Sequence, residues 1–99
     1  MISAKQLQSS YNNLYECLRN YIWPYDVVNT IAELEISVYN TFPSTSEILI
    51  HFMRINNFCK MYLSKDKELA KSLSSFGDTL KQADSGIYAK LDVRLQGVN

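Results

Sequence analysis

The sequence predicts an all-α protein, an antiparallel four-helix bundle with a short C-terminal arm. Apolar residues recur at helical spacing in four successive segments. The 99 residues include only three Gly and two Pro, which disfavours a β fold with many turns. Hydrophobic residues make up 46% of the chain, an ordinary value for a globular protein, so we expect residues 1–99 to form one domain.

The four segments share one rhythm, in which apolar side chains are three or four residues apart and therefore lie on one face of a helix. The expected helices lie near residues 4–22, 25–42, 45–63 and 65–84. Their apolar stripes are Leu7, Tyr11, Leu14, Leu18 and Tyr21; Val27, Ile31, Leu34, Val38 and Phe42; Ile48, Phe52, Ile55, Cys59 and Tyr62; and Leu69, Leu73, Phe76, Leu80 and Ala83. The middle of each stripe should form the core, namely Leu14, Leu18, Ile31, Leu34, Phe52, Ile55, Leu73, Phe76 and Leu80.

Residues that favour helix ends are found at the expected ends of the first two helices. Ser3 can cap the first helix through its hydroxyl group. Pro24 disfavours helical geometry in Trp23, so the first helix should end there, and Pro24 then lies near the start of the second helix. Asp26 falls in the first turn of that helix, where the helix dipole favours an acid.

The later boundaries follow the same preferences. Pro43 closes the second helix, and Ser44 with Glu47 forms a capping box for the third. Ser64 or Asp66 opens the fourth helix, and Gly86 lies just beyond its end. Because the connections are short, successive helices should run antiparallel.

The C-terminal arm, residues 87–99, has a different periodicity. Apolar and polar residues alternate there with a period of two, although no other strand offers a partner. We expect an extended or partly helical arm laid across the bundle. Its inward side chains would be Ile87, Ala89, Leu91, Val93 and Leu95.

Charge and hydropathy limit the partners. Ten basic and ten acidic residues cancel, so nothing favours nucleic acid. Residues 1–43 carry a net charge of −2 and residues 44–99 one of +2, which fits either a solvated face or a surface for an acidic partner or a membrane. The longest apolar run, Ile48 to Ile50, is far shorter than the ~20 residues of a membrane span. Residues 1–6 do not resemble a signal peptide, so we expect a cytoplasmic protein.

Few residues suit catalysis or metal binding. Cys17 and Cys59 are far apart and only one His is present, so no zinc site and no cofactor are expected, and both cysteines should be buried free thiols. His51 has no partner at motif spacing and is interpreted as a boundary side chain. Glu33 and Glu35 should point to different faces of one helix. The chain is therefore not expected to be an enzyme.

Two clusters could serve either structure or binding. Tyr21, Trp23 and Tyr25 surround the first turn, as a lid over one end of the core or as an interaction patch. Basic residues gather around the third turn and the early fourth helix, as a solvated hairpin or as a docking site. They are Lys60, Lys65, Lys67 and Lys71.

Residues 62–77, YLSKDKELAKSLSSFG, resemble the most recognisable part of the immunity proteins for pediocin-like (class IIa) bacteriocins, the family that includes enterocin A immunity protein. In that family a long third helix ends in an apolar-Leu-Ser turn, here Tyr62-Leu63-Ser64. A charged segment follows, then a Leu-x3-Leu step, here Leu69 and Leu73, and a Gly. The length, the four helices and the arm also agree with the family.

The resemblance implies a cytosolic, non-enzymatic protein that protects a Gram-positive cell from a pore-forming peptide. The peptide's receptor is the membrane part of the mannose phosphotransferase permease. The immunity protein would engage the peptide–receptor complex from the cytosolic side, in peripheral contact with the inner face of the membrane, as a monomer or weak dimer. In this family the C-terminal half decides which bacteriocin is countered.

The residues expected to bind this partner therefore lie in the second half, where the positive residues also gather. They are Lys60, Lys65, Lys67, Lys71, Tyr88, Lys90 and Arg94. A second hypothesis stays open, in which the chain is a small helical adaptor or inhibitor from a phage or mobile element that acts by binding a soluble protein.

Overall fold

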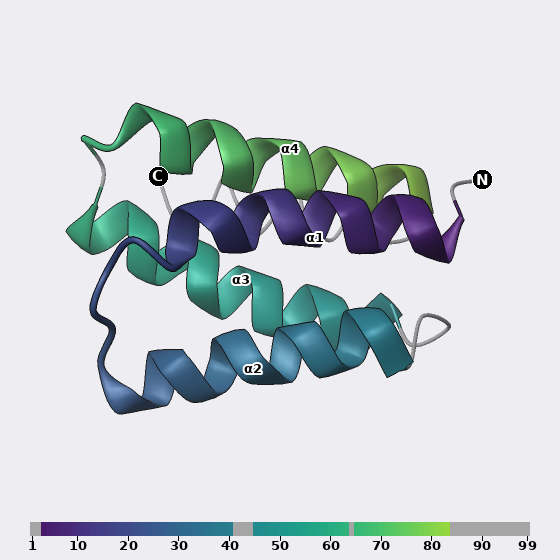
Figure 1. The fold of residues 1–99 in the computed structure, drawn as a ribbon, viewed down its shortest axis with the longest axis horizontal. Coiled ribbons are helices and arrows are strands. Elements are labelled where there is room, and N and C mark those ends of the chain that lie inside the picture. Colours follow the sequence, from purple (N-terminus) through teal and green to yellow (C-terminus); the bar gives the residue numbers. More distant parts are fainter. Residues whose placement is uncertain (1–2, 41–44, 64, 84–99) are drawn as a thin grey trace.

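The computed structural model describes residues 3–40, 45–63 and 65–83, and these ranges contain four α-helices. The helices are α1 (Ala4–Leu18), α2 (Tyr25–Asn40), α3 (Thr45–Tyr62) and α4 (Lys67–Ala83), and they run alternately in opposite directions (Figure 1). The predicted all-α, four-helix architecture is confirmed. The expected arm and the expected roles of Phe42, Pro43, Ser44 and Gly86 lie outside the described residues.

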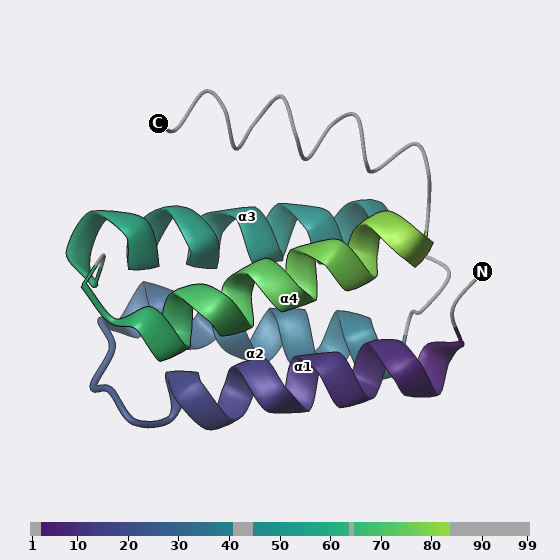
Figure 2. The same cartoon turned by 90° about the horizontal axis from the view of Figure 1, so that it is seen from above.

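The four helices surround one core in chain order. α1 packs most extensively on α4 and α2 on α3, while α1–α2 and α3–α4 are the looser neighbours. Viewed from above, α4 lies in front and α2 behind, with α1 and α3 on either side (Figure 2). Small residues bring α1 and α4 together, since Gly77 is buried and the hydroxyl groups of Ser10 and Thr79 are 3.0 Å apart. α2 and α4 are therefore diagonal partners.

The core confirms the central part of every stripe. All nine residues expected there are buried. Three aromatic rings join the helices, because the centroid of Phe76 lies 6.3 Å from that of Tyr11 and 5.0 Å from that of Phe52. The Tyr11 hydroxyl donates a hydrogen bond of 3.3 Å to the Ile31 carbonyl, which satisfies it inside the core.

α1 begins as predicted and ends earlier than predicted. The Ser3 hydroxyl accepts from the Gln6 amide while the Gln6 side chain accepts from the Ser3 amide, which completes a capping box. The expected end at residue 22 is wrong, because α1 stops at Leu18. The indole N–H of Trp23 donates to the Leu18 carbonyl at 2.8 Å, so this carbonyl is satisfied without a further helical turn.

The starts of α2 and α4 have identifiable caps. The Pro24 carbonyl accepts from the amides of Val27 and Val28, both at 3.0 Å, and Asp26 lies in the first turn of α2 as expected. Asp66 is the N-cap of α4, because its Oδ1 accepts from the Leu69 amide at 3.0 Å. α4 therefore begins at Lys67 rather than at residue 65.

Two aromatic residues at stripe ends are not in the core. Tyr62, the last residue of the third stripe, is 65% exposed. It is the last residue of α3, where its ring meets only the edge of the bundle and lies 4.6 Å from Phe58. Tyr21 is half-buried in the turn after α1. α3 instead buries a broader arc than its stripe, which adds Leu49, Met53 and Asn56.

Candidate functional site

The predicted lysines that the structure describes gather at the bundle end formed by the α3–α4 turn. Lys60 lies in the last turn of α3, Lys65 in the connection, and Lys67 and Lys71 in the first turns of α4; all four are exposed. Lys67 and Lys71 are four residues apart and share one face of α4. Tyr88, Lys90 and Arg94 lie outside the described residues.

Beside these lysines, the same bundle end carries an apolar depression of about 400 Å³, here called the aromatic hollow. Trp23 forms its centre, with its ring 5.7 Å from Tyr21 and 5.6 Å from Phe58. A smaller hollow of about 340 Å³ continues from Tyr21 and Tyr62 to Lys65 and Asp66. The residues of the aromatic hollow are Tyr21, Ile22, Trp23, Pro24, Phe58, Tyr62 and Leu63.

The lid interpretation of the aromatic cluster is right for two of its three members. Tyr21 and Trp23 pack against the core. Tyr25 is the first residue of α2 and is 79% exposed, so it does not cover the core and its place in the lid is wrong. Sequence reasoning missed Ile22 and Phe58. The signal for Phe58 was its four-residue spacing from Tyr62 at the end of α3, beside the core stripe rather than in it.

Continuous apolar surface next to a lysine is suited to binding rather than to catalysis. Aromatic rings supply large contact areas at small cost in side-chain entropy. Lys65, at the edge of this surface, can attract an acidic group or lie over an aromatic face of a partner. The chemistry that this end offers is therefore the capture of an apolar, partly acidic surface.

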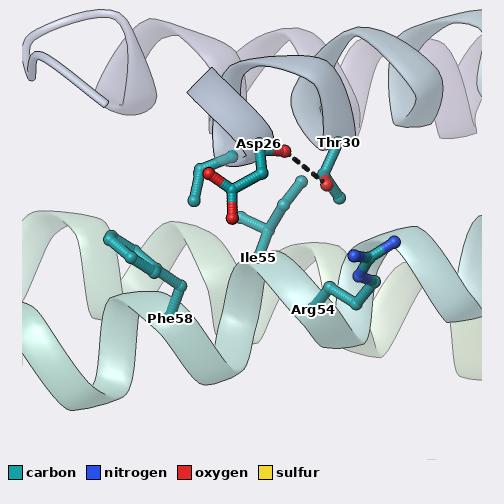
Figure 3. A pocket seen from close by; sticks show the side chains of 6 residues that line it. Asp26, Thr30, Arg54, Ile55 and Phe58 are labelled. Carbon is teal, nitrogen blue, oxygen red and sulfur yellow. Dashed lines mark hydrogen bonds between the residues drawn. The ribbon is translucent and has the colours of Figure 1, made fainter. Parts of the chain in front are cut away.

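A second depression, of about 150 Å³, lies between α2 and α3 (Figure 3). The Asp26 carboxylate points from α2 towards Ile55, while the Arg54 guanidinium lies beyond Thr30 at the other end (Figure 3). The Thr30 hydroxyl is already used, because it donates to the Asp26 carbonyl at 2.8 Å. With its two charged groups at separate ends, this pocket does not converge on one reacting atom.

Of the remaining reactive residues, only His51 and Glu33 are paired in the part of the chain that the structure describes. His51 Nδ1 lies 3.3 Å from Glu33 Oε2, an ion-pair distance for a protonated imidazole, although hydrogen-bond geometry is not met. Glu35 instead lines the groove between α1 and α2, so the two glutamates point apart as predicted. Cys17 and Cys59 are free thiols, as predicted, but only Cys59 is buried, so the expected burial of Cys17 is wrong. Burial raises the pKa of Cys59 to about 12.

Within the described ranges, no group of three or more His, Cys, Asp or Glu side chains is arranged to hold a metal ion. None of the four helices described has the length and apolar character of a membrane span. Comparison of the chain with protein-family models, with curated proteins and with solved structures finds no match.

Proposed function

We propose that this chain is a non-enzymatic immunity protein that protects a Gram-positive cell from a class IIa pore-forming bacteriocin. It would act in the cytoplasm, at the inner face of the membrane, on the complex between the peptide and the mannose phosphotransferase permease. The observation that carries the proposal is the family-like stretch, residues 62–77, whose described residues run from the last residue of α3 to Gly77 in α4.

The stretch divides into a buried and an exposed part. Leu69, Leu73 and Gly77 are buried, so their pattern reports how α4 packs on the bundle. Lys65 and Lys67 are both exposed. Lys65 lines the smaller hollow that continues from the aromatic hollow, and Lys67 follows two positions later in the chain. Recognition of a partner would therefore rest on the exposed charges and rings of this bundle end, and the buried residues would hold them in place.

A rigid support makes such recognition efficient. Asp66 caps α4 within this turn, and Trp23 bridges the α1–α2 connection to Phe58 on α3. The surface is thus built on helix ends that are ordered before binding, which lowers the entropic cost of association. Positive charge at its rim would raise the rate of encounter with an acidic partner.

The direct test is expression of the chain in a bacteriocin-sensitive strain, followed by challenge with a panel of class IIa peptides. Protection against at least one peptide supports the proposal. Sensitivity to every peptide, with the protein present at the expected level, would contradict it and leave the adaptor hypothesis.

A charge-reversal pair locates the site. Lys67→Glu should reduce protection, because it places a negative charge on the proposed docking end. Lys5→Glu is the matched control, since Lys5 is also an exposed lysine in the first turn of a helix, at the opposite end of the bundle (Figure 1). Both substitutions place an acid near a helix N-terminus and should leave stability within about 0.5 kcal/mol. Equal protection by the two variants would remove Lys67 from the site.

A further inference from the structure

α2 has a second apolar stripe on the side opposite its buried one. Tyr25, Val28, Ala32, Ile36 and Tyr39 follow one another at steps of three or four, so they lie on one face of the helix. All five are exposed, and the four large side chains retain between 43% and 79% of their accessible surface. The whole stripe lies within the described residues and spans about 21 Å along the helix.

The stripe carries no charged side chain, and the acids of α2 lie beside it rather than in it. Glu33 lies against His51 of α3, and Asp26 lines the pocket between α2 and α3. Glu35 borders the stripe, in the groove between α1 and α2, together with Arg19. A contiguous row of exposed apolar side chains is the kind of surface at which proteins bind one another.

The order of residues along the stripe is symmetric about its centre. Ala32 is the midpoint, Val28 and Ile36 stand four positions from it, and Tyr25 and Tyr39 stand seven positions from it. Each pair matches in kind, with two β-branched aliphatic residues inside and two tyrosines outside. A helix with this pattern is complementary to a copy of itself turned through a two-fold axis.

We propose that this face of α2 binds a second copy of the chain, with the two α2 helices antiparallel and a two-fold axis at Ala32. Val28 of each chain packs on Ile36 of the other, and Tyr25 packs against Tyr39. The small Ala32 side chains allow the helices to approach closely at the crossing point. Association through an isologous face of this kind is the commonest form of homodimer.

Flanking groups are compatible with this pairing. Antiparallel pairing about Ala32 places Asn29 of the second chain at the level of Glu35, and it separates the two Glu35 residues by about 9 Å along the helix axes. Tyr39 is already positioned, because its hydroxyl donates to Asn12 of α1 at 2.8 Å. The groove between α1 and α2, about 340 Å³ in volume, borders Val28 and can receive part of the Ile36 side chain.

The size of the face sets the strength of association. The contact is about 21 Å long and involves one helix of each chain. It therefore buries less than the ~800 Å² per partner of a standard interface, so the dimer is weak and dissociates on dilution. Because α2 lies diagonally across the bundle from α4, the dimer leaves Lys67 and Lys71 exposed. This inference is independent of the proposed function.

The first test measures the mass of the full chain by analytical ultracentrifugation at increasing concentration, up to about 1 mM, the range of the weakest specific complexes. We expect the mass to rise from that of the 11.4 kDa monomer towards twice this value. Ala32→Glu should hold the chain at the monomer mass, because it brings two acids together on the axis. The matched control is Ala70→Glu, an exposed alanine on α4, which should dimerise as the natural chain does.

A mixing experiment tests the two-fold arrangement itself. Ala32→Glu and Ala32→Lys should each be monomeric alone and should associate when mixed, because opposite charges then meet at the axis. Tyr25→Cys mixed with Tyr39→Cys should form a disulfide-linked dimer. Tyr25→Cys alone should not, since its two copies would be about 21 Å apart.

Three results would overturn the proposal. A natural chain that remains monomeric at every concentration would assign the face to a different partner. A dimer that survives Ala32→Glu would place the interface elsewhere. Failure of the charge-reversed pair to associate would exclude the two-fold axis at Ala32.

Discussion

Replacement of Phe76 by Ala should remove a large share of the stability of this protein. Phe76 is fully buried, and burial of a side chain of this size contributes about 1.5–3 kcal/mol. Its ring also contacts Tyr11 and Phe52, and each aromatic pair adds about 0.5–1.5 kcal/mol. The sum, about 2.5–6 kcal/mol, agrees with the ~3–5 kcal/mol typical of Phe→Ala in a core.

The loss is measurable against the total of about 5–15 kcal/mol expected for a domain. Urea unfolding followed by far-ultraviolet circular dichroism should show a lower midpoint, with a similar slope if the unfolded state is unchanged. A loss of ~4 kcal/mol should lower Tm by roughly 16–32 °C in a domain of this size. Phe52→Ala should behave similarly, since Phe52 is buried in the same aromatic group.

Tyr62→Ala is the control for this measurement. Tyr62 belongs to the same kind of periodic stripe in the sequence, yet it is 65% exposed at the end of α3. Its removal should change stability by less than about 1 kcal/mol. Equal losses for Phe76→Ala and Tyr62→Ala, or an unchanged melting curve for Phe76→Ala, would refute the assignment of the core.

Three further predictions concern a helix cap, the buried thiol and phenol groups of Cys59 and Tyr11, and the histidine. Asp66→Ala should lower the free energy of unfolding by about 0.5–2 kcal/mol, because the Leu69 amide loses its acceptor. Asp66→Asn should keep most of the stability of the natural chain, because Asn also caps helices. Urea titration of both variants tests this. Burial raises the pKa of Cys59 from its usual 9.0 to about 12, and that of Tyr11 in the same direction. These groups stay protonated in the folded chain while the unfolded chain ionises, so their contribution to stability should be constant below pH 9.0 and fall as pH rises towards 12. A flat stability profile in urea titrations at alkaline pH would contradict this. His51→Ala should leave protection of the sensitive strain unchanged, and its loss without a change in melting would require a chemical role for the imidazole.

Sequence periodicity predicted which residues form the core because burial of an amphipathic helix depends mainly on its own pattern. Leu14, Leu34 and Leu80 stand in the middle of their stripes and are all fully buried. Local capping chemistry was also readable, since a cap needs only residues within one helical turn. Ser3 illustrates this, because its partner Gln6 is three positions away.

Predictions failed where the outcome depends on contacts that reach beyond the spacing within one helix. The end of α1 is one case, since the Trp23 indole returns to the Leu18 carbonyl and closes the helix before its stripe ends. Tyr25 is another, because the cluster Tyr21, Trp23 and Tyr25 is contiguous in sequence although the start of α2 turns Tyr25 away from the core. The aromatic hollow needed Phe58 of α3 beside Trp23, and spacing within one helix cannot reveal a neighbour on another.

The sequence by itself determined the class of fold, the number of helices in the described residues, the core faces of α1, α3 and α4, and the cap of α1. The tertiary structure decided which lysines share a bundle end with aromatic rings and which of the two stripes of α2 is buried. Both stripes, one through Val27 and Leu34 and one through Val28 and Ile36, satisfy helical spacing. Periodicity gives angles about the axis of a single helix, whereas burial depends on where neighbouring helices lie. Only the packing of α1 and α3 against α2 covers the first stripe and leaves the second exposed.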